Sequence, residues 1–105
     1  MKIEFARSFQ QDLIDIHEYI GKKLLNPEAA DKMIALIVKK YERLEQFPKM
    51  GQILETDGNL PSKYRVLHAK NYLIFYEITE GVVLMHRVIY ARRDFVRVLM
   101  AGVVG

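Results

Sequence analysis

The sequence has 105 residues, enough for a single domain over 1–105, and it contains no cysteine. The absence of cysteine excludes disulfide scaffolds, thiolate zinc sites, iron–sulfur clusters and cysteine nucleophiles. Half of the residues are apolar, 28% are charged and the formal net charge is +3, the balance of an ordinary globular protein. No apolar run reaches the roughly 18–20 residues of a membrane span, so we expect a cytoplasmic protein without a membrane partner.

The positive charge is concentrated in the second part of the chain. Residues 1–60 hold nine Lys or Arg and ten Asp or Glu, a net charge of −1. Residues 61–105 hold seven and three, a net charge of +4. Such a surplus suits an anionic partner, and a solvated sheet face would have the same composition.

The first part of the chain indicates a strand followed by two helices. Residues 2–5 alternate polar and apolar side chains, which predicts a short strand. From residue 7 apolar residues recur at helical spacing, at Phe9, Leu13, Ile16 and Ile20. The opposite side, which carries Asp12, Asp15 and Glu18, is expected to be a solvated acidic stripe.

A second helix begins at Asn26-Pro27-Glu28, because Asn caps helices and Pro suits the first helical position. Its apolar stripe includes Met33 and ends before Pro48 and Gly51. We expect Met33 to fill the core, with Met85 from a later strand, and the two helices to form an antiparallel pair. Residues 48–62 hold several Pro and Gly residues with little periodicity, which indicates a loop.

Three runs rich in β-branched and aromatic residues follow this loop: Lys63–His68, Tyr72–Ile78 and Val82–Tyr90. Their connections are short enough to require antiparallel hairpins. Strict alternation places Tyr64, Val66 and His68 on one face of their strand. In the last run it places Val83, Met85, Arg87 and Ile89 on one face.

The predicted fold is therefore α+β with the order β-α-α-β-β-β, a helical hairpin packed on a small, mainly antiparallel sheet. The second face of that sheet is either a concave surface or a second core. Asp94 is a candidate cap for a short C-terminal helix, and residues 99–105 are expected to form a flexible tail.

Candidate functional residues are basic and lie on the predicted sheet. No His pair has metal-ligand spacing and no phosphate-binding loop is present, so we expect no metal and no cofactor. Arg87 lies among apolar neighbours and therefore requires a partner, a rim position or a bound anion. Clustered guanidinium groups suit phosphate or carboxylate recognition. The predicted target-binding residues are Lys63, Arg65, Lys70, Arg87, Arg92, Arg93 and Arg97.

Residues 1–99 resemble the RelE/ParE superfamily of bacterial type II toxin–antitoxin (plasmid stabilisation) toxins. The resemblance is carried by three segments in a fixed order, which are YRVL at 64–67, NYLIFY at 71–76 and RVIYARRD at 87–94. It implies a growth-inhibiting toxin that is neutralised by a cognate antitoxin, and a complex that binds operator DNA through the antitoxin. The implied target is either DNA gyrase, for ParE-like members, or the ribosome with its mRNA, for RelE-like endoribonucleases.

The sequence departs from the RelE-like nuclease pattern at two places. Leu73 stands where those nucleases usually have Arg, and the terminal segment offers Phe95 and Leu99 where they have Tyr or His. Arg65 and Arg93 match basic positions of the nuclease site and are the candidate catalytic residues. His68 and Tyr90 are the local candidates for proton transfer, which cleavage by a 2′-hydroxyl needs.

Three hypotheses follow from these departures. The first is a toxin that acts by binding gyrase. The second is a ribosome-dependent mRNA interferase that uses Arg65 and Arg93, the one case in which the protein is an enzyme. The third is a non-toxic member that serves only as antitoxin partner and co-repressor.

Overall fold

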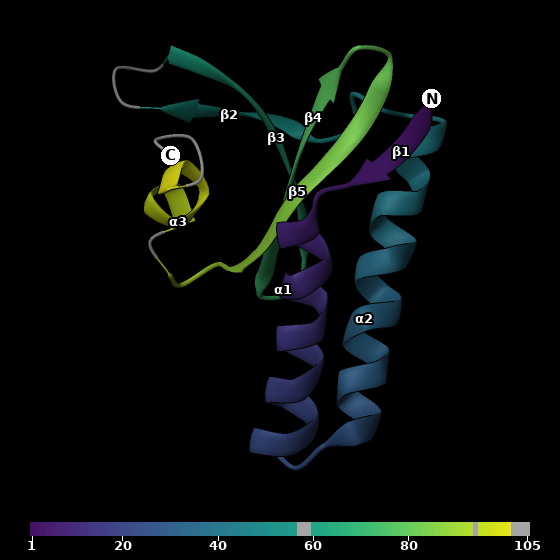
Figure 1. The fold of residues 1–105 in the computed structure, drawn as a ribbon, viewed down its shortest axis with the longest axis vertical. Helices are drawn as coiled ribbons and strands as arrows, with labels where there is room; N and C mark the ends of the chain where they lie inside the picture. The colour runs from purple at the N-terminus through teal and green to yellow at the C-terminus, as the bar shows by residue number, and fades with distance from the viewer. Residues whose placement is uncertain (57–59, 94, 102–105) are drawn as a thin grey trace.

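A five-stranded sheet lies between a long helical hairpin and a short C-terminal helix in the computed structural model (Figure 1), which describes residues 1–56, 60–93 and 95–101. The N-terminal elements are β1 (Lys2–Phe5), α1 (Arg7–Glu18), the π-helical turn η1 (Tyr19–Lys23), α2 (Pro27–Glu42) and the 3-10 turn η2 (Arg43–Glu45). The C-terminal elements are β2 (Gln52–Thr56), β3 (Leu60–Ala69), β4 (Tyr72–Thr79), β5 (Val82–Tyr90) and α3 (Phe95–Ala101).

The strand order in the sheet is β1-β5-β4-β3-β2. β1 runs parallel to β5, and the other neighbours are antiparallel hairpin partners. The α+β fold class, the N-terminal strand and the three predicted strands are confirmed. The sheet contains one more strand than predicted, because β2 lies in the segment expected to be a loop.

The prediction that residues 48–62 form a loop is wrong for β2 and for the start of β3. Gln52 pairs with Val66 and Ile53 with Arg65, which places β2 at the edge of the sheet. An edge strand has a single neighbour, and the side chains of Gln52, Ile53 and Glu55 are exposed. Exposure on both faces removes the alternating apolar pattern by which a strand is recognised in a sequence.

The helical hairpin follows the sequence prediction. The Asn26 side chain accepts a hydrogen bond of 3.1 Å from the Ala29 N–H, so the predicted cap of α2 is confirmed. Phe9 and Ile16 of α1 are buried, and α1 and α2 lie side by side over one face of the sheet. Figure 1 shows that the far turns of the hairpin extend past the sheet, so one end of it projects from the body.

Both faces of the sheet are covered, so the second face forms a second core. The core under α1 and α2 includes Phe9, Ile37, Leu44, Ile74, Tyr76 and Met85. The core on the α3 side consists of Tyr64, Leu73, Phe75, Ile89 and Leu99. Met33 and Met85 are buried, as predicted.

A β-bulge corrects the predicted faces of β5. The register between β4 and β5 shifts between Phe75 and Tyr76. Val83 and Met85 therefore lie in the helix-side core, while Ile89 lies in the α3-side core. The extra residue changes the phase of the alternation, so strict period two holds only as far as Met85.

The C-terminal helix extends further than predicted. α3 continues to Ala101, and Leu99, the first residue of the expected tail, is buried in the α3-side core. Residues 102–105 of that tail and the predicted cap Asp94 lie outside the described residues.

Candidate functional site

A cleft of about 690 Å³ lies between α1–η1 and the end of the sheet formed by the β3–β4 turn and the exit of β5. Four of the predicted site residues line it, namely Lys70, Arg87, Tyr90 and Arg93. Its apolar wall consists of Ile16, Ile20, Leu24, Met33 and Val88. The fold thus gathers residues from five elements around one hollow that is basic at the turn and, at the helices, apolar with the two carboxylates of Asp12 and Asp15.

The basic end of the cleft is built by backbone geometry at two chain reversals. Lys70 has φ of 52°, a left-handed conformation that closes the turn between β3 and β4. The Ala91 N–H donates to the Asn71 carbonyl at 2.8 Å, which joins the exit of β5 to that turn. The Arg93 N–H donates to the Tyr90 carbonyl at 3.0 Å and turns the chain again. Within the residues that the structure describes, neither the Lys70 nor the Arg93 side chain has a hydrogen-bond or ion-pair partner.

Tyrosine rings form the middle of the cleft. Tyr72 and Tyr90 are cross-strand partners, and their rings meet edge to face with centroids 5.5 Å apart. Burial raises the pKa of Tyr72 above 10, and the neighbouring Tyr90 and Tyr19 raise it further. The Tyr72 hydroxyl is therefore neutral at physiological pH and able to donate or accept a hydrogen bond.

The floor of the cleft holds a buried ion pair between α1 and β5. Arg87 donates to both carboxylate oxygens of Asp12, at 2.7 and 2.9 Å, and the Val88 N–H donates to the same carboxylate at 2.9 Å. The hydrogen bonds that Arg87 donates to Asp12 raise the pKa of Arg87 and keep it charged. The prediction that Asp12 belongs to a solvated stripe is wrong, because its carboxylate is the partner that Arg87 required.

The remaining predicted residues lie away from the cleft. Arg65 donates to the carbonyl oxygens of Lys49 and Gly51, at 3.3 and 2.9 Å. Lys63 lies 3.9 Å from the Glu77 carboxylate, which also binds the His86 ring at 2.8 Å. The side chains of His68, Arg92 and Arg97 are exposed.

The predicted catalytic residues are thus distributed over two parts of the sheet. Arg65 pairs with Tyr76, whereas Tyr72, beside Tyr90, pairs with Ala69. Four residues of β3 separate these positions, which corresponds to roughly 13 Å along a strand. Arg65 therefore lies in the middle of β3, at the last residue paired with β4, whereas Tyr90 and Arg93 lie near the β3–β4 turn.

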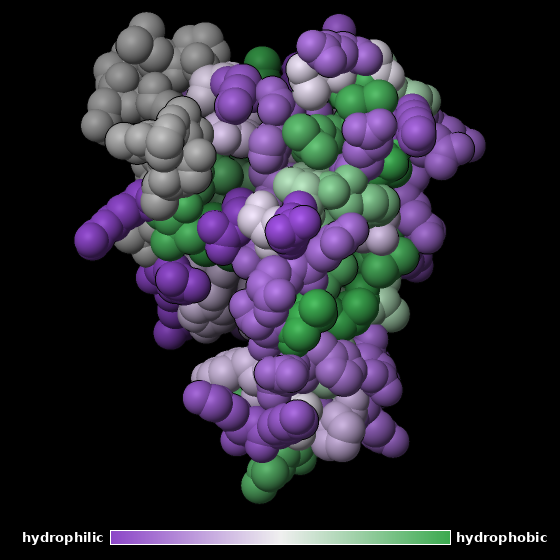
Figure 2. All heavy atoms as spheres, viewed as in Figure 1, coloured by the Kyte–Doolittle hydropathy of each residue, from purple (hydrophilic) through white to green (hydrophobic). Residues whose placement is uncertain are grey.

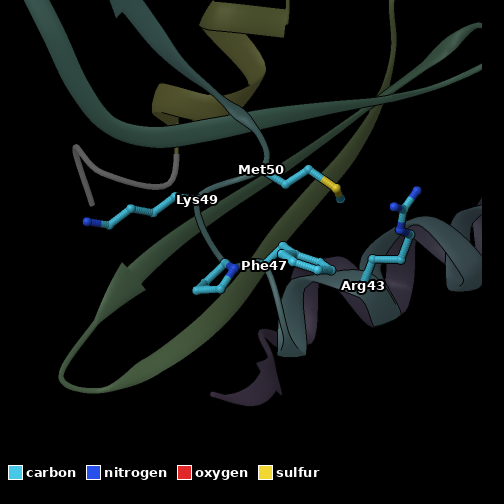
Figure 3. Close-up of a pocket in the computed structure, with 5 residues that line it drawn as sticks. Arg43, Phe47, Lys49 and Met50 are labelled. Carbon is cyan, nitrogen blue, oxygen red and sulfur yellow. The ribbon is translucent and has the colours of Figure 1, made fainter.

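A second hollow of about 510 Å³ lies between the end of α2 and the start of β2 (Figure 3). Its lining residues are Arg43, Phe47, Pro48, Lys49 and Met50, and none of them was a predicted site residue. The Tyr76 hydroxyl donates to the Pro48 carbonyl at 2.8 Å and accepts the Gly51 N–H at 2.9 Å. Together with Arg65, this hydroxyl fixes the backbone behind the hollow.

Two cleft residues, Tyr19 and Tyr72, were missed as site residues in the sequence. Tyr72 lies opposite Tyr90 only because of the bulge, since a regular hairpin register from Thr79 and Val82 would set it opposite Ile89. Tyr19 lies in a π-helical turn that shifts it relative to ordinary helical spacing. Among the described residues, no group of three or more His, Cys, Asp or Glu could hold a metal ion, and no helix is long and apolar enough to cross a membrane.

Two solved structures can be compared with this fold. A chain of the chromosomal ParDE toxin–antitoxin system from P. aeruginosa superimposes with a TM-score of 0.73 at 19% identity, over 88% of this chain and 97% of that chain. A chain of the RelB–RelE antitoxin–toxin complex from Methanococcus jannaschii matches with a TM-score of 0.48 at 22% identity, over 82% of this chain and 87% of that chain. No curated protein sequence matches.

The sequence itself is matched by a family model. The model describes the ParE toxin of the parDE type II toxin–antitoxin system, and the match covers residues 3–95. That span includes both helices of the hairpin, every strand of the sheet and the residues of the cleft. The expected membership of the RelE/ParE superfamily is confirmed, and the chain belongs to the ParE toxin family of type II toxin–antitoxin systems.

Proposed function

We propose that this ParE-family toxin inhibits growth by binding DNA gyrase and that a cognate antitoxin neutralises it. The observation that carries the proposal is the position of Arg65. Its guanidinium group donates to two backbone carbonyls, and Arg65 lies four residues along β3 from the turn end of the hairpin, where Arg93 lines the cleft. A nuclease of the RelE type would need both arginines around one phosphate, with proton donors and acceptors beside them.

The cleft has the properties of a surface that binds protein. Its tyrosine rings and apolar wall offer contact area, and Lys70 and Arg93 offer charge that forms no ion pair within the described residues. Aromatic residues and arginine are enriched at the centres of protein interfaces. An acidic surface, on the target or on the antitoxin, would complement the cations.

The experiment separates the two targets with purified components. The toxin is added to gyrase in a supercoiling and DNA-cleavage assay and to a reconstituted translation system. We expect loss of supercoiling or trapped cleaved DNA, with translation unaffected. Cut mRNA in the translation system, with gyrase unaffected, would contradict the proposal and support a nuclease.

A matched pair of charge reversals tests the cleft. The Lys70→Glu and Arg93→Glu variants are expected to weaken inhibition of gyrase at least about tenfold, since each reverses a charge at the contact. Lys39→Glu makes the same change on an exposed position of α2 outside the cleft and is the control. Equal loss in all three variants would indicate general electrostatics rather than contact through the cleft.

A further inference from the structure

The end of the helical hairpin, residues 22–25, projects from the body of the molecule and is called the hairpin tip below. It joins the π-helical turn η1 to α2 and lies at the far end of the long axis in Figure 1. The space-filling view shows apolar surface at this end of the hairpin (Figure 2). The tip is therefore an apolar feature at the part of the structure furthest from the sheet.

The backbone of the tip is strained at a leucine. Leu25 has φ of 54°, in the left-handed region that L-residues with a side chain avoid because Cβ crowds the following carbonyl oxygen. The Asn26 N–H donates to the Ile20 carbonyl at 3.1 Å, so Leu25 occupies the position after a helix where glycine is usual. Glycine or asparagine would end the same helix without that strain.

Burial does not compensate this strain. Leu25 is 83% exposed and Leu24 is 55% exposed, which leaves both side chains largely in water. The α2 cap beside them is formed by the Asn26 side chain and needs neither leucine. The folded structure thus contains a residue that is unfavourable both in its backbone conformation and in its contact with water, and a binding role accounts for both.

The charges of the tip indicate what it binds. Lys22 and Lys23 are exposed next to the two leucines, and no carboxylate in the described part of the chain pairs with either. An apolar point flanked by two ammonium groups is complementary to an apolar pocket with carboxylates at its rim. A bilayer is a poorer match, because even a whole myristoyl chain, which is larger than two leucine side chains, anchors a protein only weakly.

We propose that the hairpin tip inserts Leu24 and Leu25 into an acid-rimmed apolar pocket on the protein that this toxin inhibits. Leu24 also lines the cleft, so the tip and the cleft form one continuous contact surface. The inference rests on the proposed function, in that it requires a toxin that acts by binding a protein. It does not require that protein to be gyrase.

The test uses the opposite effects that Leu25 has on stability and on binding. Leu25→Gly and Leu25→Asn relieve the strained backbone, so the thermal midpoint of the folded chain is expected to stay unchanged or to rise by about 4 °C. The same variants remove the apolar point, so growth inhibition on induction is expected to fall at least about tenfold. Ile14→Asn is the control, because Ile14 is also an exposed apolar residue, at 53%, but lies outside both tip and cleft.

Several results would overturn the inference. Full growth inhibition by both Leu25 variants would show that the tip does not contact the target, while leaving the proposed function intact. A wild-type chain that folds but does not inhibit growth would remove the proposed function and the inference with it. Binding of wild-type protein, but not Leu25→Asn, to phosphatidylglycerol vesicles would assign the tip to a membrane instead. Loss of antitoxin binding with toxicity retained would assign it to the antitoxin.

Discussion

Positive charge is placed differently at two positions along the β3–β4 hairpin. At the position near β2, the Arg65 guanidinium donates to the carbonyl oxygens of Lys49 and Gly51. At the turn, Lys70 and Arg93 line the cleft without an internal partner in the described part of the chain. Both positions are basic in the sequence, and only the structure separates cations that hold the fold from cations that are available to another molecule.

Arg87 shows that a cation that lines the cleft can also be one that holds the fold. Its guanidinium lies on the cleft floor, and it donates two hydrogen bonds to the Asp12 carboxylate. The Asp12 carboxylate already neutralises this guanidinium charge. We therefore expect Lys70 and Arg93, rather than Arg87, to supply charge for recognition, and the comparison predicts a graded series of effects on stability.

The largest effect is expected for Asp12→Ala. The substitution leaves the Arg87 charge and the Val88 N–H unpaired under α1, which should lower the free energy of unfolding by about 3 kcal/mol. Urea denaturation followed by circular dichroism measures the change. Glu18→Ala, at an exposed position of α1 outside the cleft lining, is the control and should change stability by less than about 0.5 kcal/mol. Equal effects for the two would contradict the internal role of the pair.

A smaller loss is expected for Tyr76→Phe. The buried hydroxyl accepts the Gly51 N–H and donates to the Pro48 carbonyl, so its removal should lower the free energy of unfolding by about 1–2 kcal/mol. The same denaturation experiment measures the loss. Tyr41→Phe should change stability by under about 0.5 kcal/mol, because no hydrogen bond is formed by the Tyr41 hydroxyl in the described residues. A loss no larger than that of Tyr41→Phe would mean that the segment after η2 is held by packing alone.

Alkaline pH provides a milder perturbation of the same contact. Burial raises the pKa of the Tyr76 phenol, although the Gly51 hydrogen bond and the nearby Arg65 oppose the shift. The folded chain therefore keeps this proton to higher pH than the unfolded chain, whose phenol ionises near pH 10. Above pH 10 the unfolded state binds fewer protons, so stability should decline as pH rises, and the decline should be less steep in Tyr76→Phe. Thermal midpoints between pH 8 and pH 11 would show it.

The smallest effect on stability is expected in the cleft itself. The double substitution Lys70→Ser and Arg93→Ser removes two exposed cations that have no internal partner, and should change the free energy of unfolding by less than about 0.5 kcal/mol. The same variant should lose growth inhibition, which is scored by colony formation after induction. A large loss of stability would show that Lys70 and Arg93, like Arg65, hold the fold, and it would contradict the difference drawn between them.

Local patterns in the sequence were sufficient for most of the fold. The Asn26–Pro27 helix start, the apolar spacing of α1 and the three strand runs are all formed by neighbouring residues, and all are confirmed. β2 could not be predicted, because an exposed edge strand lacks alternation. The reversal of faces after Met85 could not be predicted either, since a bulge depends on the pairing of two strands.

The candidate site was predicted only in part, for the same physical reason. Lys70, Tyr90 and Arg93 were expected to act, and they do line one cleft. Their separation from Arg65 depends on the register of β3 with β4, which no local pattern reports. The pairing of Asp12 with Arg87 joins residues 75 positions apart, so helical periodicity placed Asp12 on the wrong side.

The parallel pairing of β1 with β5 has a consequence for synthesis on the ribosome. Lys2 pairs with Val82, and the Asp12 carboxylate accepts hydrogen bonds from Arg87, which is 75 residues later in the chain. At about 5–20 residues per second, the N-terminal strand stays unpaired for roughly 4–15 s during translation. A nascent chain that ends before β5 lacks Arg87 and Val88, which form the floor of the cleft. A partner that recognises the cleft is therefore expected to bind only chains in which β5 has already been synthesised.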